Sequence, residues 1–284
     1  MNKSLNINNN VLFLKVYVGT LKADELLVDL FQSFNIHGNE DFDFFFIRYA
    51  DPDPHLRLRF FFRDRNKIKF YLESILKYFG AHPFVRNVTI DDYHRELERY
   101  GVENIVNCEK LFFTDSANVA IMVLNTLEDQ EMRLRLGIGM FSYYLEYCFE
   151  DCEKVLSYLN TVRESYREEF NYSNDVKNCV SKHYRLLYSG NLISEENELV
   201  HRFLEQNIDL DQYRQDLRKI LRESTVDSMG LIGSLIHMFY NRLFPSYQRE
   251  LEYLSYELMV RLFRTKLSLE KKHMRNNLLP CDMV

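Results

Sequence analysis

A six-residue stretch, His55-Leu56-Arg57-Leu58-Arg59-Phe60, alternates polar and apolar side chains without a break. Successive side chains of a β-strand point to opposite faces, so this period of two predicts a strand in a sheet with one apolar face. The other face carries a histidine and two arginines. A guanidinium binds a carboxylate through two parallel hydrogen bonds, and charge on a half-buried face is costly without an anion, so this face is a candidate carboxylate site. The alternative is an interstrand network in which these cations pair with the protein's own acids.

The flanking sequence predicts a small α+β layer around this strand. Hydrophobic periodicity predicts strands at 11–18, 42–49 and 55–62, a further extended segment at 84–92, and helices at 23–34 and 66–79. The turn sequence Ala50-Asp51-Pro52-Asp53-Pro54 joins the second and third of these strands, so they are expected to form an antiparallel hairpin. Gly101 is expected to permit a sharp change of direction.

After residue 101 the hydrophobic period becomes helical. Helices are predicted at 102–107, 116–127, 131–149, 153–170, 175–187, 194–206, 224–243 and 247–276. The predicted fold class is therefore α+β, with an antiparallel β-sheet layer in the N-terminal part packed on a predominantly α-helical bundle. We expect residues 1–284 to form a single domain, with a sheet part at 1–101, a helical part at 102–284 and the active site between them.

Composition excludes several classes of protein. The chain has 46% hydrophobic and 14% aromatic residues, which is enough for a substantial core. Its net charge of −6 argues against an extended nucleic-acid footprint, so no direct DNA contact is expected. No apolar segment follows the polar residues 1–10, and no apolar run is long enough to cross a bilayer, so we expect no membrane insertion and a cytoplasmic protein.

Cysteine usage points to reduced thiols. The five cysteines form an odd and scattered set: Cys108, Cys148, Cys152, Cys179 and Cys281. Cys148 and Cys152 lie four residues apart on a predicted helix, but no second Cys or His pair completes a zinc site, so we expect no bound metal.

Two further polar stretches are candidates for chemistry. The first, Glu96-Leu97-Glu98-Arg99-Tyr100-Gly101, ends a charged segment at a glycine and could aim Glu96 and Arg99 toward the sheet, although a solvated run of charges is the simpler interpretation. The second places His237 and Asn241 one turn apart on a mostly apolar helix, where Asn241 could orient the histidine ring. The alternative for His237 is a satisfied core histidine.

These motifs, in their order and spacing, resemble a known family. His55 to Arg59, Glu96 to Gly101, the stretch Glu109-Lys-Leu-Phe-Phe-Thr-Asp-Ser116 and His237 to Leu243 are together similar to the elimination domain of tRNA-dependent lantibiotic dehydratases, which includes the thiopeptide-type bacteriocin biosynthesis domain. The resemblance covers nearly the whole chain. Two departures are Val102, where the family often has a second glycine, and the absence of the family's usual Trp near the first strand.

The resemblance implies a lyase without a cofactor. In this family the dehydratase first glutamylates Ser or Thr of a precursor peptide using glutamyl-tRNA, and the elimination domain then expels glutamate to leave dehydroalanine or dehydrobutyrine. Arg57, Arg59 and Arg99 match the family's arginines and would hold the glutamyl carboxylates, and His237 matches its helix histidine. A positioned base must remove the Cα proton, and arginines aimed at the departing carboxylate would stabilise the transition state.

The sequence does not decide which residue removes the proton. His237, Arg59 and Arg99 are the predicted catalytic residues, and the predicted substrate-binding set is Arg57, Arg59, Arg99, His55, Glu96 and Asn241. Glu96 and His55 could instead position arginines or be purely structural, and Asp115 and Asn241 belong to the same supporting class.

The resemblance also implies partners. The chain corresponds to the elimination half alone, so we expect a glutamylated precursor peptide with leader and core as substrate and a separate tRNA-dependent protein as the glutamylating partner. Oligomeric state is left open, a homodimer included. Two alternative functions are a thiopeptide pyridine synthase, which joins two dehydroalanines by a formal [4+2] cycloaddition, and a non-catalytic subunit that binds the peptide or the partner.

Overall fold

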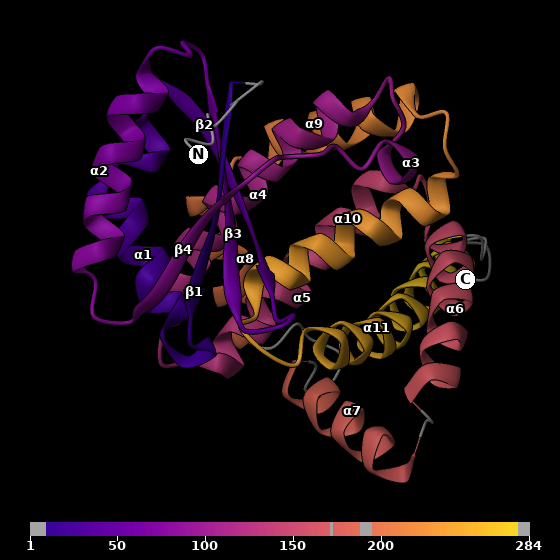
Figure 1. The fold of residues 1–284 in the computed structure, drawn as a ribbon. Helices are drawn as coiled ribbons and strands as arrows, with labels where there is room; N and C mark the ends of the chain where they lie inside the picture. Colours follow the sequence, from indigo (N-terminus) through magenta and orange to yellow (C-terminus); the bar gives the residue numbers. More distant parts are fainter. Residues whose placement is uncertain (1–9, 171–172, 188–194, 278–284) are drawn as a thin grey trace, which may run out of the picture. The chain divides into compact units, whose positions relative to one another are not determined.

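A computed structural model describes residues 10–170, 173–187 and 195–277 of the chain. Figure 1 shows strands in the first third of the sequence, drawn in indigo and purple, and helices through most of the remainder. The predicted α+β class, with an antiparallel sheet in the N-terminal part, is confirmed.

The sheet has four strands in the order β2-β3-β1-β4. They are β1 (Val11–Val18), β2 (Phe42–Tyr49), β3 (His55–Phe62) and β4 (Val85–Asp91). All neighbouring strands are antiparallel, and β2 and β3 form the predicted hairpin with Tyr49 opposite His55. Because β3 lies between β2 and β1, its arginines lie inside the sheet and not at an edge.

Helices account for most of the other described residues. The α-helices are α1 (Ala23–Ser33), α2 (Lys67–Ala81), α3 (Leu97–Tyr100), α4 (Ile105–Asn125), α5 (Gln130–Cys148), α6 (Cys152–Phe170), α7 (Asn174–Leu187), α8 (Glu195–Asn207), α9 (Leu210–Glu223), α10 (Ser228–Leu243) and α11 (Gln248–Asn277). Short 3-10 turns occur at Thr20–Lys22 and Ile36–Gly38. Ser194, the predicted first residue of the helix at 194–206, lies outside the described residues.

The two faces of the sheet differ as the alternation predicts. The apolar face packs on α1 and α2: Phe31 of α1 meets Phe44 edge-on at 5.3 Å between ring centroids, and Tyr71 of α2 meets Phe42 edge-on at 5.2 Å. Edge-to-face pairs contribute stability beyond the area they bury. The opposite face, which we call the arginine face, carries His55, Arg57 and Arg59.

The predicted break between the helices at 102–107 and 116–127 is wrong, because α4 is continuous from Ile105 to Asn125. Its middle turns contain polar residues that interrupt the apolar pattern of the sequence. Three of these, Glu109, Asp115 and Ser116, are nevertheless buried, because each contacts a polar partner inside the protein. These buried polar side chains interrupt the apolar periodicity, so the sequence pattern did not predict one continuous helix.

Helix α9 was not predicted, and α10 begins later than expected. Helix α9 is strongly charged, but Tyr213, Leu217 and Ile220 form a buried stripe at helical spacing. The Asp227 carboxylate accepts a hydrogen bond from the Gly230 backbone N–H at 2.6 Å, which caps α10 and fixes its start at Ser228 rather than at residue 224.

The chain forms two compact units. Unit 1 comprises residues 1–133 and 207–248, and unit 2 comprises residues 134–206 and 249–284. In unit 2, α5 and α8 approach closely at Gly139, where a Cβ atom would lie 2.8 Å from Val200 Cγ1. The predicted parts at 1–101 and 102–284 are a different partition of the chain, and the assignment of residues 1–284 to one elimination domain stays a prediction.

Among the described residues, no helix is long and apolar enough to span a membrane. The described cysteines, Cys108, Cys148, Cys152 and Cys179, are free thiols, and Cys281 lies outside the described residues.

Candidate active site

The His55 ring lies between two tyrosine rings, and both of its nitrogens form hydrogen bonds. Its side chain is buried between the rings of Tyr17 and Tyr49, at 4.9 and 5.5 Å between centroids. Arg57 Nε can only donate and lies 3.2 Å from His55 Nε2, so the ring proton sits on Nδ1 and is donated to Asp53 O at 2.8 Å. Burial lowers the His55 pKa and favours this neutral form. Of the roles predicted for His55, the geometry supports positioning Arg57.

Arg57 is fixed from the other side as well. Its guanidinium carbon lies 3.5 Å from the centroid of the Tyr49 ring, a cation–π contact, while its side chain stays partly exposed. Stacking and the His55 hydrogen bond together hold the guanidinium plane, and they leave further N–H donors of Arg57 for an incoming anion.

Arg59 is a buried cation surrounded by aromatic rings. Its guanidinium carbon lies 4.5 Å from the Phe13 ring, 4.9 Å from Phe45 and 5.2 Å from Tyr93, and the residue is 7% exposed. Within the described chain, Arg59 Nε has no hydrogen-bond partner, and the contact of Nη1 with Arg57 O is long at 3.4 Å. Burial lowers the Arg59 pKa to about 10 despite the opposing effects of Tyr93 and Glu96, so the residue stays charged at neutral pH.

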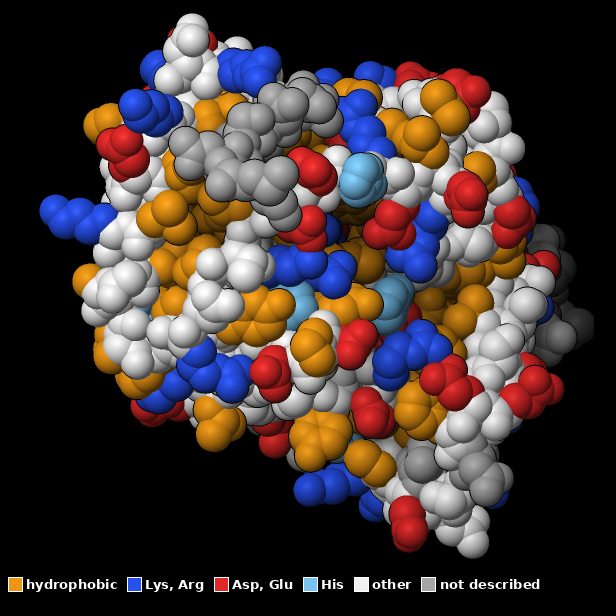
Figure 2. Space-filling view, in the orientation of Figure 1, with side chains coloured by type: hydrophobic (Ala, Val, Ile, Leu, Met, Phe, Trp, Pro, Cys, Tyr) orange, Lys and Arg blue, Asp and Glu red, His pale blue; other side chains and the backbone are white. Residues whose placement is uncertain are grey.

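The predicted alternative, in which protein acids neutralise these arginines, does not describe the arginine face. Among the described residues, neither Arg57 nor Arg59 forms an ion pair with an Asp or Glu. Asp91, which lies on β4 beyond β1, pairs with Lys15. Figure 2 shows Lys, Arg and His side chains near the middle of the surface with Asp and Glu side chains among them, over the region where Figure 1 draws β3 and α10.

Tyr93 forms one wall of the Arg59 environment and was missed in the sequence. Its hydroxyl donates to Glu109 Oε1 at 2.9 Å, and Arg95 donates to both oxygens of the same carboxylate at 2.8 and 2.7 Å. The buried Glu109 carboxylate therefore anchors the Tyr93 ring on which Arg59 stacks. Glu109 belonged to the stretch that carried the family resemblance, but no sequence signal paired it with Tyr93 or Arg95.

Glu96 and Arg99 lie on the exposed segment at α3. Arg99 Nη1 lies 3.0 Å from Glu96 Oε2, and both side chains are well exposed. Gly101 follows with φ +81°, so the predicted change of direction at this glycine is confirmed. The negative charge of Glu96 acts on Arg59. The substrate-binding roles of Glu96 and Arg99 stay predictions.

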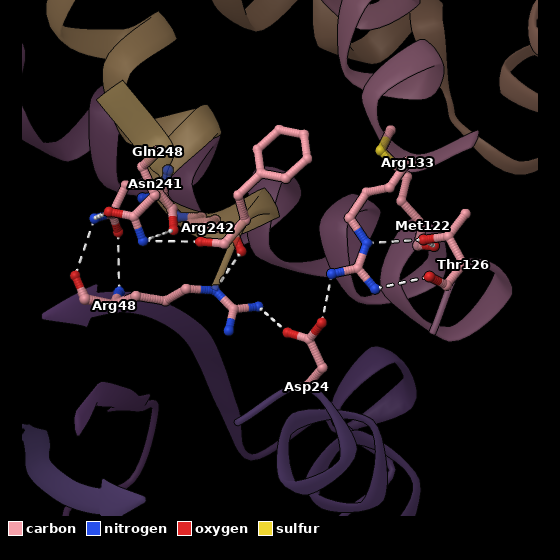
Figure 3. A network of polar contacts seen from close by, with 9 residues as sticks. Asp24, Arg48, Met122, Thr126, Arg133, Asn241, Arg242 and Gln248 are labelled. Atoms are coloured by element: carbon pink, nitrogen blue, oxygen red, sulfur yellow. Dashed lines mark hydrogen bonds and ion pairs between the residues drawn. The ribbon is translucent and has the colours of Figure 1, made fainter. Parts of the chain in front are cut away.

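Asn241 pins helix α10 to strand β2. Its Oδ1 accepts from the Arg48 backbone N–H at 2.9 Å, and its Nδ2 donates to Arg48 O at 2.9 Å and to Gln248 Oε1 at 3.3 Å (Figure 3). Both amide hydrogens are thereby used, so Asn241 could contact the His237 ring only through Oδ1, and its role in orienting that ring stays a prediction. His237 itself lies one turn before Asn241 and is partly exposed.

Arg242, the next residue, is fully buried beside the arginine face. Its Nε donates to Phe46 O at 3.0 Å, and its Nη1 lies 3.4 Å from Asp115 Oδ2, while Tyr213 donates to the other oxygen of Asp115. Burial raises the Asp115 pKa to about 6, although Arg242 and Tyr213 oppose the shift. Asp115 thus forms an ion pair with Arg242, a residue to which no individual role was given in the sequence, and its supporting role in the site stays a prediction.

Arg242 and Arg59 share an aromatic neighbour. The Arg242 guanidinium carbon lies 6.0 Å from the Phe45 ring and 4.9 Å from Phe112, and Arg59 contacts the same Phe45 ring. The charge of Arg242 also acts on Arg59 and helps to lower its pKa. A second buried cation behind the arginine face adds to the positive potential there.

A second buried network ties the sheet to its helices. Arg48 donates to Asp24 Oδ1 at 2.6 Å and to Arg242 O at 2.8 Å, and Arg133 donates to the other oxygen of Asp24 and to Thr126 (Figure 3). Burial tends to raise the Asp24 pKa, but Arg48 and Arg133 together lower it. Here two buried arginines share one protein carboxylate as an ion-pair partner, in contrast to Arg59.

Among the described residues, no group of three or more His, Cys, Asp or Glu side chains could hold a metal ion. All the predicted site residues fall in unit 1, where they lie on β3, on the segment at α3 and on α10.

Sequence comparison with known proteins assigns the chain to a family. Residues 12–263 match the family described as "Lantibiotic biosynthesis dehydratase C-term". The chain is 29% identical over 269 residues to the nisin biosynthesis protein NisB of Lactococcus lactis subsp. lactis, and 28% identical over 251 residues to the subtilin biosynthesis protein SpaB of Bacillus subtilis. These alignments cover 90% and 85% of the chain, but the chain spans only about a quarter of the length of either relative.

Solved structures agree on the fold. The tRNA-dependent lantibiotic dehydratase MibB from Microbispora sp. 107891 matches with a TM-score of 0.67 over 96% of this chain and 29% of its own, at 19% identity. TsrL matches with a TM-score of 0.61 over 91% of this chain and 95% of its own, at 14% identity. The fold is thus that of a dehydratase-type α+β protein. By its sequence match the chain belongs to the lantibiotic biosynthesis dehydratase C-terminal family.

Proposed function

We propose that this protein eliminates glutamate from glutamylated Ser or Thr residues of a ribosomally made precursor peptide in lanthipeptide or thiopeptide bacteriocin biosynthesis. Arg59 carries the proposal: it is a buried guanidinium that forms no ion pair with an acid among the described residues. Such a group is costly to bury and binds a carboxylate well when one arrives. Family membership supports the same reaction class.

The reaction is a β-elimination. A base removes the Cα proton of the glutamylated residue, the electron pair forms the Cα–Cβ double bond, and the Cβ–O bond breaks to release glutamate as a carboxylate. The leaving group gains negative charge as that bond breaks, so a buried guanidinium that does not have to reorganise favours the transition state over the ground state.

The residues take distinct roles in the proposal. Arg59 binds the departing carboxylate, and Arg57, oriented by His55 and Tyr49, holds the glutamyl group beside it. Arg99 and Glu96 contact the same group from the exposed segment, and His237 acts as acid or base. A separate tRNA-dependent glutamylating protein supplies the ester.

The test is mass spectrometry of a synthetic peptide that bears one O-glutamyl serine, incubated with the purified protein. Wild type is expected to convert the ester to dehydroalanine with release of glutamate. Arg59→Ala and His237→Ala are each expected to lower kcat by about 100-fold or more, because each loses a group that acts in the transition state. The matched control is Arg63→Ala, since Arg63 is exposed near the end of the same strand and pairs with Asp43.

Full activity of Arg59→Ala would contradict the assignment of the carboxylate site. An intact ester with folded wild-type protein, in the presence and absence of a glutamylating partner, would contradict elimination itself.

A further inference from the structure

The two edge strands of the sheet differ in whether their outward backbone groups form hydrogen bonds. At the outer edge of β2, Phe46 N–H donates to Ser116 Oγ at 3.2 Å and Phe46 O accepts from Arg242 Nε at 3.0 Å. Two residues further along β2, the Asn241 side chain forms hydrogen bonds with both the N–H and the C=O of Arg48. Side chains of α4 and α10 therefore satisfy this edge and prevent another strand from pairing with it.

Strand β4 forms the other edge. Val18 N–H donates to Pro54 O on the β3 side of β1, and hydrogen bonding alternates along a strand, so Lys15 faces β4 and pairs with Thr89. The residues on either side of Thr89, which are Val88 and Ile90, therefore direct their backbone N–H and C=O groups away from β1.

These outward groups have no partner within residues 10–170, 173–187 and 195–277. Hydrogen bonds of this segment run to β1 and, at Val85, to His82 O. Val88 and Ile90 are partly exposed, and the neighbouring Asn87 and Asp91 are exposed. An open row of backbone donors and acceptors is a template for an extended chain.

The register connects this edge to the arginine face. Across β4, β1 and β3, one row of side chains runs from Asp91 through Phe13 to Arg59, and the next runs from Thr89 through Lys15 to Arg57. A strand added beside β4 would continue these rows, with alternate side chains on the arginine face. At roughly 4.8 Å per strand, its backbone would lie about 14 Å from that of β3, a span that a glutamyl ester and an arginine side chain cover together.

We propose that the precursor peptide binds as a fifth strand along β4, through backbone hydrogen bonds to Val88 and Ile90, and presents its glutamyl ester to the arginine face. This inference rests on the proposed function for the identity of the peptide. Recognition through the backbone tolerates many sequences, and only every second residue of the peptide faces Arg57 and Arg59. The arginine face therefore processes glutamylated residues of one parity in a given register.

Proline at residue 88 tests this docking selectively. Val88→Pro removes the outward N–H without removing a hydrogen bond to β1, and edge strands tolerate proline at such positions. The probe is a synthetic decapeptide of Ala, Thr and Gly with one central O-glutamyl serine. Its KM is expected to rise about fivefold or more in Val88→Pro, with kcat within about twofold of wild type.

Two controls make the test specific. Val88→Ala keeps the N–H and is expected to leave the decapeptide KM unchanged. A minimal substrate, N-acetyl-O-glutamyl-serine methylamide, has too little backbone to form a strand and is expected to react equally with wild type and Val88→Pro. An unchanged decapeptide KM in Val88→Pro would overturn the docking proposal, as would an equal loss on the minimal substrate.

Hydrogen exchange separates this proposal from the proposed function. The same decapeptide without the glutamyl group is expected to slow exchange of the Val88 and Ile90 amides at saturating concentration. Slowed exchange without elimination of the ester would leave the docking in place and refute the proposed function. Elimination without slowed exchange would support the function and refute the docking.

Discussion

At the scale of single residues, the protein buries arginines in two different ways. Arg48 is buried with Asp24 as its counter-ion and makes a further hydrogen bond to Arg242 O. Arg59 is buried to a similar extent among aromatic rings with no described acid in contact. A buried charge without a partner weakens the folded state, so its presence at Arg59 is best explained by a ligand.

This contrast predicts opposite effects of the same substitution. Arg59→Met is expected to raise the free energy of unfolding by about 1 kcal/mol or more, because it removes an uncompensated buried charge and keeps the side-chain volume. Arg48→Met is expected to lower it by about 2 kcal/mol, because the hydrogen bonds of Arg48 to Asp24 and to Arg242 O are lost while Arg133 still compensates the Asp24 charge. Urea unfolding of the two variants measures both changes. A loss of stability in Arg59→Met as large as that in Arg48→Met would contradict the description of Arg59 as unpaired.

The sequence revealed only part of this site. Alternation alone placed His55, Arg57 and Arg59 on one face, because side-chain direction in a strand is a local property. It could not reveal that Tyr93 stacks on Arg59 or that Arg242 lies behind Phe45. Each of these contacts joins residues that are far apart in the sequence and meet only after folding. The substrate roles of Arg99 and His237 came from the family resemblance and stay predictions.

At the scale of elements, helices α4 and α10 hold strand β2 through polar side chains. Ser116 and Asn241 bind its outer backbone groups, and Arg242 reaches Phe46 O. Both helices therefore carry polar residues on their inward sides. This burial explains why the apolar periodicity of the sequence divided α4 in two, and why the contact of Asn241 with the strand was not predicted.

Strand and hairpin boundaries were the most predictable elements. The bounds expected for β1, β2 and β3 agree with the structure residue for residue, because β1 and β2 are rich in β-branched or aromatic residues and β3 alternates polar and apolar residues. The order β2-β3-β1-β4 and the open edge at β4 were not predicted, since pairing between distant strands leaves no local signal.

At the scale of the whole molecule, two buried carboxylates give opposite dependences of stability on pH. The Asp115 pKa is raised from 3.8 to about 6, so the folded state binds more protons than the unfolded state between these values, and stability falls as the pH rises through that window. The Asp24 pKa is lowered, so its contribution is present above pH 3.8 and is lost as the pH falls.

Comparison with Asp115→Asn isolates the first effect. The difference in unfolding free energy between wild type and Asp115→Asn is expected to shrink by roughly 2 kcal/mol from pH 4 to pH 6, because asparagine does not titrate. Urea unfolding at half-unit pH intervals measures the difference. A difference that grows over this range would show that Arg242 dominates burial and that Asp115 is ionised throughout.

The family match runs from residue 12 to residue 263 and so includes parts of both compact units, whereas every predicted site residue belongs to unit 1. The α+β class followed from the change in hydrophobic period near residue 101. The grouping of α4, α9 and α10 with the sheet did not, because it depends on long-range packing and on buried polar contacts such as Asn104 Nδ2 to Ile220 O at 2.8 Å.

The most direct test of the carboxylate site is the binding of glutamate, the expected product, measured by calorimetry on wild type, Arg59→Met and the exposed-site control Arg63→Ala. Glutamate is expected to bind wild type and Arg63→Ala with the same affinity, and Arg59→Met at least about tenfold more weakly, since a charge-assisted hydrogen bond is lost. Equal affinity for all three proteins would show that Arg59 does not receive the carboxylate and would contradict the account.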